Sequence, residues 1–321
     1  MRSGFASIIG RPNAGKSTLL NRLVGQKLAI VTPKPQTTRN RIQGIVNIAR
    51  KGARPAGQIV LIDTPGIHKP ENSLNRKMMQ EVYAALEGCD LLLLIVDITQ
   101  KFGPGDQFAV DLVRRTTERS TRKGSERMRA FLLLNKIDLI DKTKLLPIMQ
   151  RYSELFPFDE IIPISASKGD GIDLLLDTVV RTLPAGQQYF PKDQITDQPE
   201  RFLVAEIIRE KVLMSTAEEV PYAATVIVEQ WQEEPKLIRI AATIYCERDG
   251  QKAIIIGKQG QMLKRIGTEA RQEIERILGT KVFLELFVKV REGWRDSRAF
   301  VEELDWRKQL ENLATGSEDN S

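Results

Sequence analysis

The sequence predicts an α/β domain with a mostly parallel sheet and helices on both faces, followed by a smaller α+β domain of order αββααβ. Two observations carry this prediction. Short β-rich apolar runs alternate with helix-length amphipathic segments as far as Leu183, which is typical of a parallel sheet. Beyond a polar stretch rich in Pro, the pattern changes to a helix, two strands, two helices and a strand. A length of 321 residues, at about 150 per domain, gives each of two domains its own core.

The first domain is expected to span residues 1–184, with its strands separated by helices and by turn-forming residues. Two stretches, residues 50–58 and 114–129, interrupt the alternation, and we expect them to be surface loops or a frayed helix end. The expected strands comprise residues 5–9, 59–62, 91–97, 131–135 and 161–164.

Residues 185–199 contain Pro191 and Pro199 and follow no period, as is typical of a domain linker. The second domain, residues 200–314, is expected to end in an amphipathic helix at 298–313, and residues 315–321 are expected to be disordered. Its other expected elements are a helix at 200–214, strands at 224–231 and 237–246, a helix–turn–helix at 253–278 and a strand at 281–290.

Composition excludes several classes of protein. Apolar residues amount to 41% and charged residues to 28%, as in ordinary globular proteins. The longest apolar run, residues 91–96, is far shorter than the roughly 18 residues of a membrane-spanning helix. Two cysteines and one histidine are too few for a disulfide framework or a Cys/His metal site. The N-terminal residues do not have the pattern of a secretory signal, so we expect the protein to reside in the cytoplasm.

A Gly-rich segment between a predicted strand and a predicted helix matches the P-loop pattern. Its two glycines permit backbone conformations that point successive N–H groups and a helix N-terminus at phosphate oxygens. The lysine then reaches the β- and γ-phosphates, and the serine reaches a Mg²⁺ ion. A strand-to-helix turn that binds nothing is the alternative for the motif taken alone. The expected phosphate-binding residues are Gly10, Arg11, Pro12, Asn13, Ala14, Gly15, Lys16, Ser17 and Thr18.

A second motif, Asp63, Thr64, Pro65 and Gly66, ends another apolar strand. In P-loop NTPases an acidic side chain at this place approaches the metal from the side opposite the P-loop. Asp63 is not expected to bind the Mg²⁺ ion directly. It is expected to contact the groups that do. Taken alone, an Asp before a Pro-Gly turn is more often structural, so this assignment depends on the P-loop.

Guanine recognition is predicted at the ends of two further strands. Guanine presents two adjacent donors, its ring N–H and its exocyclic amine, which the two oxygens of Asp138 can accept, whereas adenine lacks this pair. Asn135 and Lys136 lie at the same strand end, and open α/β sheets bind ligands at this edge. A backbone N–H for the guanine carbonyl is expected from Ser165, Ala166 and Ser167.

Together, in this order and at successive strand ends, these motifs resemble those of the translation-factor-class GTPases, so a GTP site is expected. The resemblance implies GTP as substrate and Mg²⁺ as cofactor. It also implies that a threonine of the mobile loop at residues 26–40 contacts the Mg²⁺ ion and the γ-phosphate. By alignment to the family pattern this is Thr38, with Thr37 as the alternative. The catalytic groups expected from the resemblance are Lys16, Thr38, Asp63 and Gly66.

Hydrolysis without a partner is expected to be slow. Ile67 stands where Ras-like proteins have a glutamine that orients the attacking water, and isoleucine cannot hydrogen-bond a water. His68 follows, and we expect a solvated loop residue there rather than a general base. Some relatives with Pro-Asn in this loop use the Asn side chain to hold a K⁺ ion in place of an arginine finger, so Asn13 is a candidate K⁺ ligand.

A Gly-x-x-Gly turn lies between the two central helices expected in the second domain. The turn alone is a weak signal. Its αββααβ context is that of a type II KH domain, and KH domains clamp about four nucleotides at such a turn. The glycines let a sugar-phosphate backbone approach, and the neighbouring lysine can pair with a phosphate. The expected RNA-binding residues are Ile256, Gly257, Lys258, Gln259, Gly260, Lys264 and Arg265.

A GTPase domain followed by such a KH domain resembles the Era family over essentially the whole chain. The resemblance implies a GTP-dependent monomer that binds the 3′ region of small-subunit ribosomal RNA and assists maturation of the small ribosomal subunit. It also implies peripheral contact with the inner face of the membrane. Two alternatives are an RNA chaperone for which nucleotide is only a structural ligand, and a GTPase that serves tRNA modification or a membrane. The matching segments comprise residues 36–39, 195–197, 209–212, 218–222 and 255–267.

The formal net charge of +6 is unevenly distributed along the chain. Residues 1–194 carry 29 basic and 19 acidic side chains, whereas residues 195–321 carry 19 and 23. Within the second domain, residues 252–298 hold 11 basic and 6 acidic side chains, which confines nucleic acid to one face. The basic stretches 50–54 and 114–129 are expected to touch ribosomal RNA or anionic lipid.

Overall fold

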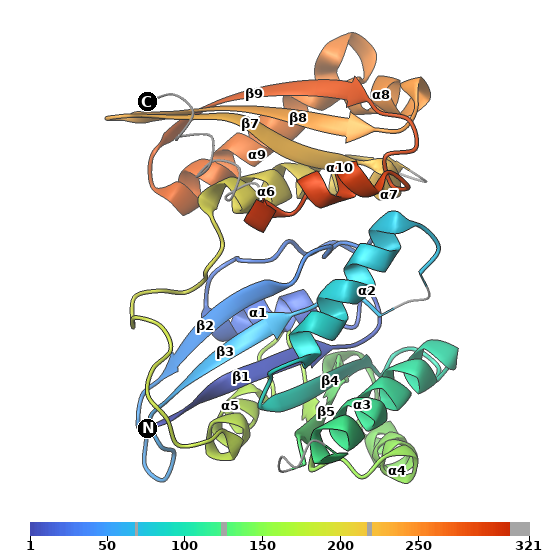
Figure 1. Cartoon of the computed structure of the whole chain (residues 1–321), viewed down its shortest axis with the longest axis vertical. Helices are drawn as coiled ribbons and strands as arrows, with labels where there is room; N and C mark the ends of the chain where they lie inside the picture. The colour runs from blue at the N-terminus through green and yellow to red at the C-terminus, as the bar shows by residue number, and fades with distance from the viewer. Residues whose placement is uncertain (68–69, 123–126, 217–219, 309–321) are drawn as a thin grey trace. The chain divides into compact units, whose positions relative to one another are not determined.

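The chain forms two compact units in the computed structural model, which describes residues 1–67, 70–122, 127–216 and 220–308 (Figure 1). Unit 1 comprises residues 1–69 and 78–197, and unit 2 comprises residues 70–77 and the chain from Gln198 onward. His68 and the expected disordered tail, residues 315–321, lie outside the described residues.

Unit 1 is built on a six-stranded sheet of order β2-β3-β1-β4-β5-β6. Every neighbouring pair is parallel except β2 and β3, which are antiparallel. The expectation of a mostly parallel sheet is therefore confirmed. The strands are β1 (Arg2–Ile9), β2 (Ile42–Ile48), β3 (Gly57–Asp63), β4 (Leu91–Asp97), β5 (Arg129–Asn135) and β6 (Glu160–Ile164).

Helices cover both faces of this sheet, as expected (Figure 1). One core packs Leu19 of α1 and Val179 of α5 against the sheet, and the other packs Val82 of α2 and Val110 of α3 against the opposite face. The central strand β4 is buried on both faces, which is why it consists of apolar residues without alternation. The helices are α1 (Lys16–Val24), α2 (Ser73–Leu86), α3 (Pro104–Arg122), α4 (Leu145–Leu155) and α5 (Ile172–Thr182).

Strand β2 was not among the expected strands. Gly44, Ile45 and Val46 are consecutive and all buried, so the strand lacks the apolar–polar alternation that identifies a half-exposed strand. The basic stretch that follows forms the turn between β2 and β3, closed by a bridge between Lys51 and Arg54. The second basic stretch begins within α3, which continues as far as Arg122.

The segment expected as a linker is fastened to unit 1, and we refer to residues 184–197 as the strap. Gln58 of β3 is fully buried, and its side-chain oxygen accepts hydrogen bonds from the backbone N–H groups of Tyr189 (2.8 Å) and Phe190 (3.0 Å). Its amide nitrogen donates to the Phe190 carbonyl at 2.9 Å. Further along, the backbone N–H of Ile45 donates to the carbonyl of Ile195 at 2.8 Å. The strap therefore continues the hydrogen bonding of the sheet edge.

Unit 2 has the expected αββααβ order, with three strands that pack on helices around a core rich in isoleucine. The middle strand β8 pairs antiparallel with β7 and parallel with β9, as in a type II KH domain. One additional helical turn, α7 (Val220–Ala223), precedes β7. The main elements are α6 (Glu200–Ser215), β7 (Thr225–Glu234), β8 (Leu237–Cys246), α8 (Asp249–Ile256), α9 (Gln261–Leu278) and β9 (Lys281–Val290).

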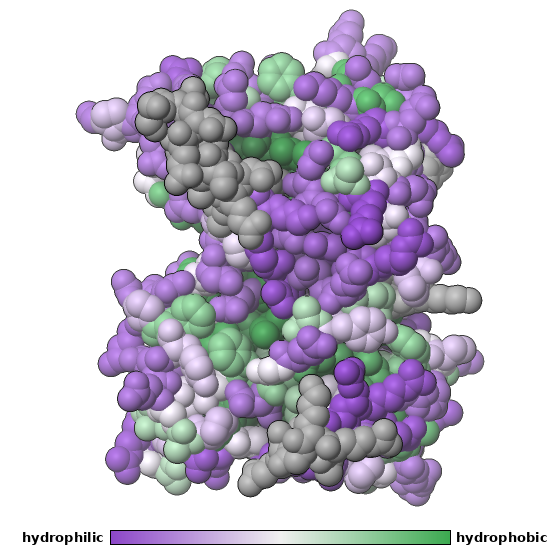
Figure 2. All heavy atoms as spheres, viewed as in Figure 1, coloured by the Kyte–Doolittle hydropathy of each residue, from purple (hydrophilic) through white to green (hydrophobic). Residues whose placement is uncertain are grey.

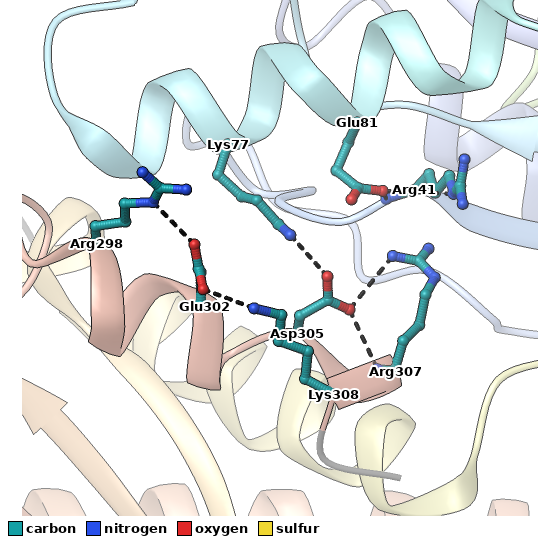
Figure 3. A network of polar contacts seen from close by, with 8 residues as sticks. All are labelled: Arg41, Lys77, Glu81, Arg298, Glu302, Asp305, Arg307 and Lys308. Carbon is teal, nitrogen blue, oxygen red and sulfur yellow. Dashed lines mark hydrogen bonds and ion pairs between the residues drawn. The ribbon is translucent and has the colours of Figure 1, made fainter. Parts of the chain in front are cut away.

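The expected C-terminal helix is interrupted. Helix α10 (Arg298–Glu303) ends before Asp305, where the chain is not helical, and residues 306–308 are helical again. The Asp305 side chain accepts hydrogen bonds from the backbone N–H of Arg307 (3.1 Å) and from Lys77 Nζ (2.7 Å) within unit 2 (Figure 3). This capping arrangement competes with a continuous helix. Residues 309–313 lie outside the described residues.

None of the helices in the described part of the chain has the length and apolar character needed to cross a bilayer. On the face shown in Figure 2, hydrophilic residues predominate and the hydrophobic residues form separate small patches.

Candidate functional site

The expected phosphate loop connects β1 to α1 at the carboxyl edge of the sheet. Gly15 has a left-handed φ of 101°, and an added Cβ would collide with the side-chain amide of Asn135. A Cβ on Gly10 would collide with the carbonyl oxygen of Ile95. Asn13 also has a left-handed backbone, with φ of 62°. Both glycines of the motif are therefore required by the close approach of neighbouring strands, and Gly15 is also required by its backbone conformation.

Lys16 is buried at the start of α1, and its ammonium group lies against the loop. Nζ donates hydrogen bonds to the carbonyls of Gly10 (3.1 Å) and Arg11 (2.9 Å). Burial lowers the pKa of Lys16 to about 8, and the nearby Asp63 carboxylate opposes part of this effect. A phosphate in the loop would favour the charged form of Lys16, because an anion stabilises a buried ammonium group.

Three oxygen-bearing side chains from three segments meet beside Lys16. Ser17 Oγ donates to Asp63 Oδ2 at 2.6 Å, and Ser17 Oγ lies 2.8 Å from Thr38 Oγ1. Burial raises the pKa of Asp63 to about 6, while Lys16 and the Ser17 hydrogen bond oppose that shift. Asp63 Oδ1 is buried and has no hydrogen-bond partner among the described residues. Hard oxygen donors around an unpaired carboxylate oxygen are the ligand chemistry that Mg²⁺ prefers.

Of the two candidate loop threonines, the structure brings Thr38 to this oxygen cluster. The Thr37 hydroxyl is engaged elsewhere in the loop, 2.7 Å from the Thr32 hydroxyl and 2.6 Å from the Lys34 carbonyl, to which it donates. Thr38 is also buried, whereas the loop residues before it are largely exposed or half-buried.

The segment after Asp63 rests on the phosphate loop. Gly66 lies so close to Pro12 that an added Cβ would be 2.7 Å from the Pro12 ring and 2.8 Å from its nitrogen. The backbone N–H of Ile67 donates to the carbonyl of Gly10 at 3.0 Å, and the Ile67 side chain is buried. Thr64 Oγ1 donates to the carbonyl of Ile8 at 2.8 Å. Two segments about fifty residues apart in the chain are thereby held together at the expected γ-phosphate position.

Asn135 connects the phosphate side of the site to the base side. Its amide nitrogen donates to the Ala14 carbonyl at 2.7 Å, and its oxygen accepts the N–H of Ala166 at 3.0 Å. Lys136 has a left-handed φ of 71°, and its Nζ lies 2.5 Å from Asp97 Oδ2. Sequence reasoning missed Asp97. The available signal was its position at the end of the apolar strand β4, whereas its pairing with Lys136 follows from the register of β4 against β5.

An open pocket of about 390 Å³ lies among these segments. Asp138 sits on an exposed turn (Ile137–Leu139), and its neighbour Leu139 contributes to the pocket wall. Sequence reasoning missed several members of the lining, because they belong to the loop before β2 or are apolar. The lining comprises Pro12, Asn13, Gly15, Lys16, Ser17, Thr18, Ile30, Val31, Thr32, Pro33, Gln36, Thr37, Thr38, Gly66, Asn135, Lys136, Leu139, Ala166 and Ser167.

The Gly-x-x-Gly turn of unit 2 joins α8 to α9 through one 3-10 turn (Lys258–Gly260). Gly257 has φ of 71°, and an added Cβ would lie 2.6 Å from Met262 Cβ. Gly260 has φ of 76° but faces open space, and Gln259 is also left-handed at 52°. Three residues with positive φ give the turn a compact backbone that a sugar-phosphate backbone can approach.

The side chains expected to contact RNA are mostly accessible. Lys258, Gln259, Lys264 and Arg265 are exposed, and Ile256 is half-buried. Arg265 forms an ion pair of 2.9 Å with Glu269, so its charge is partly compensated. The turn and the first two turns of α9 thus present basic side chains on one surface of unit 2.

Comparison with known proteins extends this description. The family model "50S ribosome-binding GTPase" matches residues 5–136, and the family model "KH domain" matches residues 219–295. GTPase Era of Geobacter metallireducens is 50% identical over 307 residues, which cover 95% of this chain and 98% of the relative. GTPase Era of Syntrophus aciditrophicus is 48% identical and covers 96% of each chain. This chain belongs to the Era family of GTPases.

Solved Era structures agree with this assignment. A crystal structure of Era in complex with MgGDPNP and nucleotides 1506–1542 of 16S ribosomal RNA matches with a TM-score of 0.87. The two chains are 39% identical, and the match covers 95% of this chain and 99% of that chain. A variant of Aquifex aeolicus Era bound to GDP and AlF4⁻ matches with a TM-score of 0.84. As a member of the Era family, this chain is a GTPase with a C-terminal KH domain.

Proposed function

We propose that this Era-family GTPase binds Mg²⁺ and GTP in the unit 1 pocket and binds the 3′ region of small-subunit ribosomal RNA through the Gly-x-x-Gly turn. In this role it assists maturation of the small ribosomal subunit. The observation that carries the proposal is the Era structure with MgGDPNP and the 3′ nucleotides of 16S ribosomal RNA, because that match covers both units. The oxygen cluster of unit 1 and the exposed basic turn of unit 2 support it.

In the proposed reaction, each group of the site has a defined task. Lys16 exchanges its contacts with the Gly10 and Arg11 carbonyls for the phosphates. Ser17 and Thr38 would hold the Mg²⁺ ion, which when bound supplies charge neutralisation between the β- and γ-phosphates. Asp63 accepts the hydrogen bonds of the groups around the ion. The N–H of Gly66 is the candidate donor to the γ-phosphate, whereas the buried Ile67 offers no group to orient a water.

The RNA-binding part of the proposal predicts a sequence-dependent affinity. A fluorescein-labelled RNA with the 3′ terminal sequence of small-subunit RNA should bind the full chain, loaded with GDPNP and Mg²⁺, at least tenfold more tightly than a scrambled RNA of equal length. We expect this difference in affinity because a KH domain recognises the bases of single-stranded RNA as well as its phosphates. Fluorescence anisotropy at several salt concentrations checks this, because phosphate contacts alone would give equal affinities for both RNAs. Equal affinities would contradict the proposal.

We also propose a K⁺ requirement for hydrolysis, with Asn13 as ligand. The Asn13 amide nitrogen donates to the Pro33 carbonyl at 2.8 Å, which directs the side chain along the edge of the pocket. Single-turnover hydrolysis without a partner should be slow, on the order of minutes or longer, in Na⁺. It should be at least tenfold faster in K⁺, and Asn13→Ala should remove this difference. Equal rates in the two salts would exclude K⁺ as a cofactor.

The chain is further proposed to act in the cytoplasm as a monomer, with peripheral contact to anionic lipid. The basic stretches 50–58 and 114–129 are the feature that supports the lipid contact. Arg54 is paired with Asp177 at 2.9 Å, and Arg114 is paired with Asp111 at 2.9 Å and donates to the Leu155 carbonyl. The positive charges of these two guanidinium groups are therefore partly compensated by acidic side chains of unit 1.

A further inference from the structure

Arg22, on the exposed side of α1, holds the loop that follows β6. Its Nε donates to the carbonyl of Ala166 at 3.1 Å, and its Nη2 donates to the carbonyl of Ser167. Both carbonyls belong to the segment expected to meet the guanine base, and both residues line the pocket. A guanidinium group fits two successive carbonyls because its N–H donors are fixed in one plane.

The same loop is held from the other side by Asn135. The N–H of Ala166 donates to Asn135 Oδ1, and Asn135 Nδ2 donates to the Ala14 carbonyl in the phosphate loop. Because Arg22 lies on the helix that begins at Lys16, these contacts form a closed ring from the phosphate loop through Asn135, Ala166 and Arg22 back to α1. Ala166 is thus fixed at both its N–H and its carbonyl.

This arrangement has a stereochemical consequence for the pocket. In a trans peptide the carbonyl and the following N–H point in opposite directions. Holding the Ala166 carbonyl toward Arg22 therefore turns the N–H of Ser167 away from Arg22. The loop itself is narrow, since the N–H of Gly169 donates to the Ser165 carbonyl at 2.7 Å and Gly169 has φ of 98°. The N–H groups of Ala166 and Lys168 are engaged by Asn135 Oδ1 and Ser165 Oγ, so a shift of the Ala166 carbonyl would chiefly redirect the N–H of Ser167.

We propose that Arg22 is a positioning residue for guanine recognition: by holding the Ala166 carbonyl, it orients the backbone N–H of Ser167 toward the 6-carbonyl of the base. The proposal rests on the assignment of base recognition to residues 165–167 and to Asp138. Arg22 touches neither nucleotide nor metal in this role. Its effect is confined to one edge of the base, whereas Asp138 reads the ring N–H and the exocyclic amine at another.

The test compares three nucleotides on the full chain. Inosine diphosphate lacks the exocyclic amine, so the preference for GDP over inosine diphosphate reports on Asp138. In 6-thio-GDP a sulfur replaces the carbonyl oxygen and accepts hydrogen bonds weakly, so the preference for GDP over 6-thio-GDP reports on the loop N–H. Affinities come from competition with fluorescent GDP, and dissociation rates from stopped-flow exchange.

Arg22→Met keeps an unbranched apolar stem but removes every donor. We expect it to release GDP about tenfold faster, to reduce the preference for GDP over 6-thio-GDP and to leave the preference for GDP over inosine diphosphate unchanged. Arg22→Gln retains an amide donor for one carbonyl. It should recover part of the preference for GDP over 6-thio-GDP. Arg181→Ala, which changes an exposed arginine of α5, serves as the matched control. It should leave the GDP dissociation rate and both nucleotide preferences unchanged.

The outcomes separate this proposal from the assignment on which it rests. If Arg22→Met lowers both preferences equally, or neither, the positioning role is wrong. If the unmodified chain itself fails to distinguish GDP from inosine diphosphate and from 6-thio-GDP, the assignment of the base site is wrong, and the Arg22 proposal falls with it. Thermal unfolding of each nucleotide-free variant shows whether a loss arises from misfolding.

Discussion

Asp138→Asn should lower the affinity for GDP roughly 100-fold and raise the affinity for xanthosine diphosphate, so that the preferred base changes. The carboxylate accepts from two donors of guanine, and each charge-assisted hydrogen bond contributes about 1.5–3 kcal/mol. Xanthine has a carbonyl in place of the exocyclic amine, and the amide nitrogen of Asn can donate to it. At about 1.4 kcal/mol per tenfold change, loss of these bonds gives the stated magnitude.

Competition binding with GDP and xanthosine diphosphate measures this change on the full chain. Asp173→Asn, which neutralises an exposed carboxylate on α5, is the matched control and should leave both affinities unaltered. Because Asp138 is exposed on its short turn, the substitution should leave the thermal unfolding temperature nearly unchanged. An unchanged base preference would refute the role assigned to Asp138.

Replacing both Gly257 and Gly260 with Asp should abolish binding of the 3′ terminal RNA, at least 100-fold in affinity, and leave GTP binding intact. Two negative charges would face the phosphate backbone, and Gly257 has no room for a Cβ beside Met262. Anisotropy with labelled RNA and fluorescent-nucleotide binding are measured on the same preparation. Loss of both activities would indicate misfolding or a wrong division into domains.

Three further variants separate charge from backbone geometry. Gly250→Asp places one negative charge in the first turn of α8, where an added side chain meets open space, and should weaken RNA binding far less. Gly260→Ala should also be milder than Gly257→Ala. Gly260 has a left-handed backbone (φ 76°, ψ 6°), which disfavours a side chain by roughly 1 kcal/mol. Gly257 combines a positive φ with an extended ψ (71°, 176°), a region open essentially to glycine alone, and an added Cβ there also collides with Met262 at the start of α9. Equal effects of the two alanines would show that the Met262 contact is unimportant.

The sequence allowed prediction of those parts of the site in which neighbouring residues act together. Gly10, Gly15, Lys16 and Ser17 lie within one short motif, and the strand ends that carry Asp63 and Asn135 are recognisable as apolar runs. A parallel sheet brings such strand ends to one edge, so their meeting follows from the fold class. The choice between Thr37 and Thr38 depended on the path of the loop and required the structure.

Contacts between residues distant in sequence could not be predicted. Arg22 and Ala166 are separated by 144 positions, and nothing local distinguishes Arg22 from other arginines on helix surfaces. The Lys136–Asp97 pair depends on the register of β4 against β5. Strand β2 departs from alternation because Ile45 is buried on the face that also carries the exposed Asn47, and the break at Asp305 depended on Lys77 of α2. In each case the missing information was tertiary.

The strap determines where an independent GTPase fragment of this chain can end. A fragment that stops at residue 184 would remove the backbone groups of Tyr189 and Phe190 that satisfy Gln58, a side chain with no access to solvent in the intact chain. It would also strip the outer edge of β2 of its bond to Ile195. The Gln58 side-chain oxygen would lose both of its donors, and a newly exposed strand edge favours self-association. Expression boundaries for the isolated domain therefore belong after Asp197, at the end of unit 1.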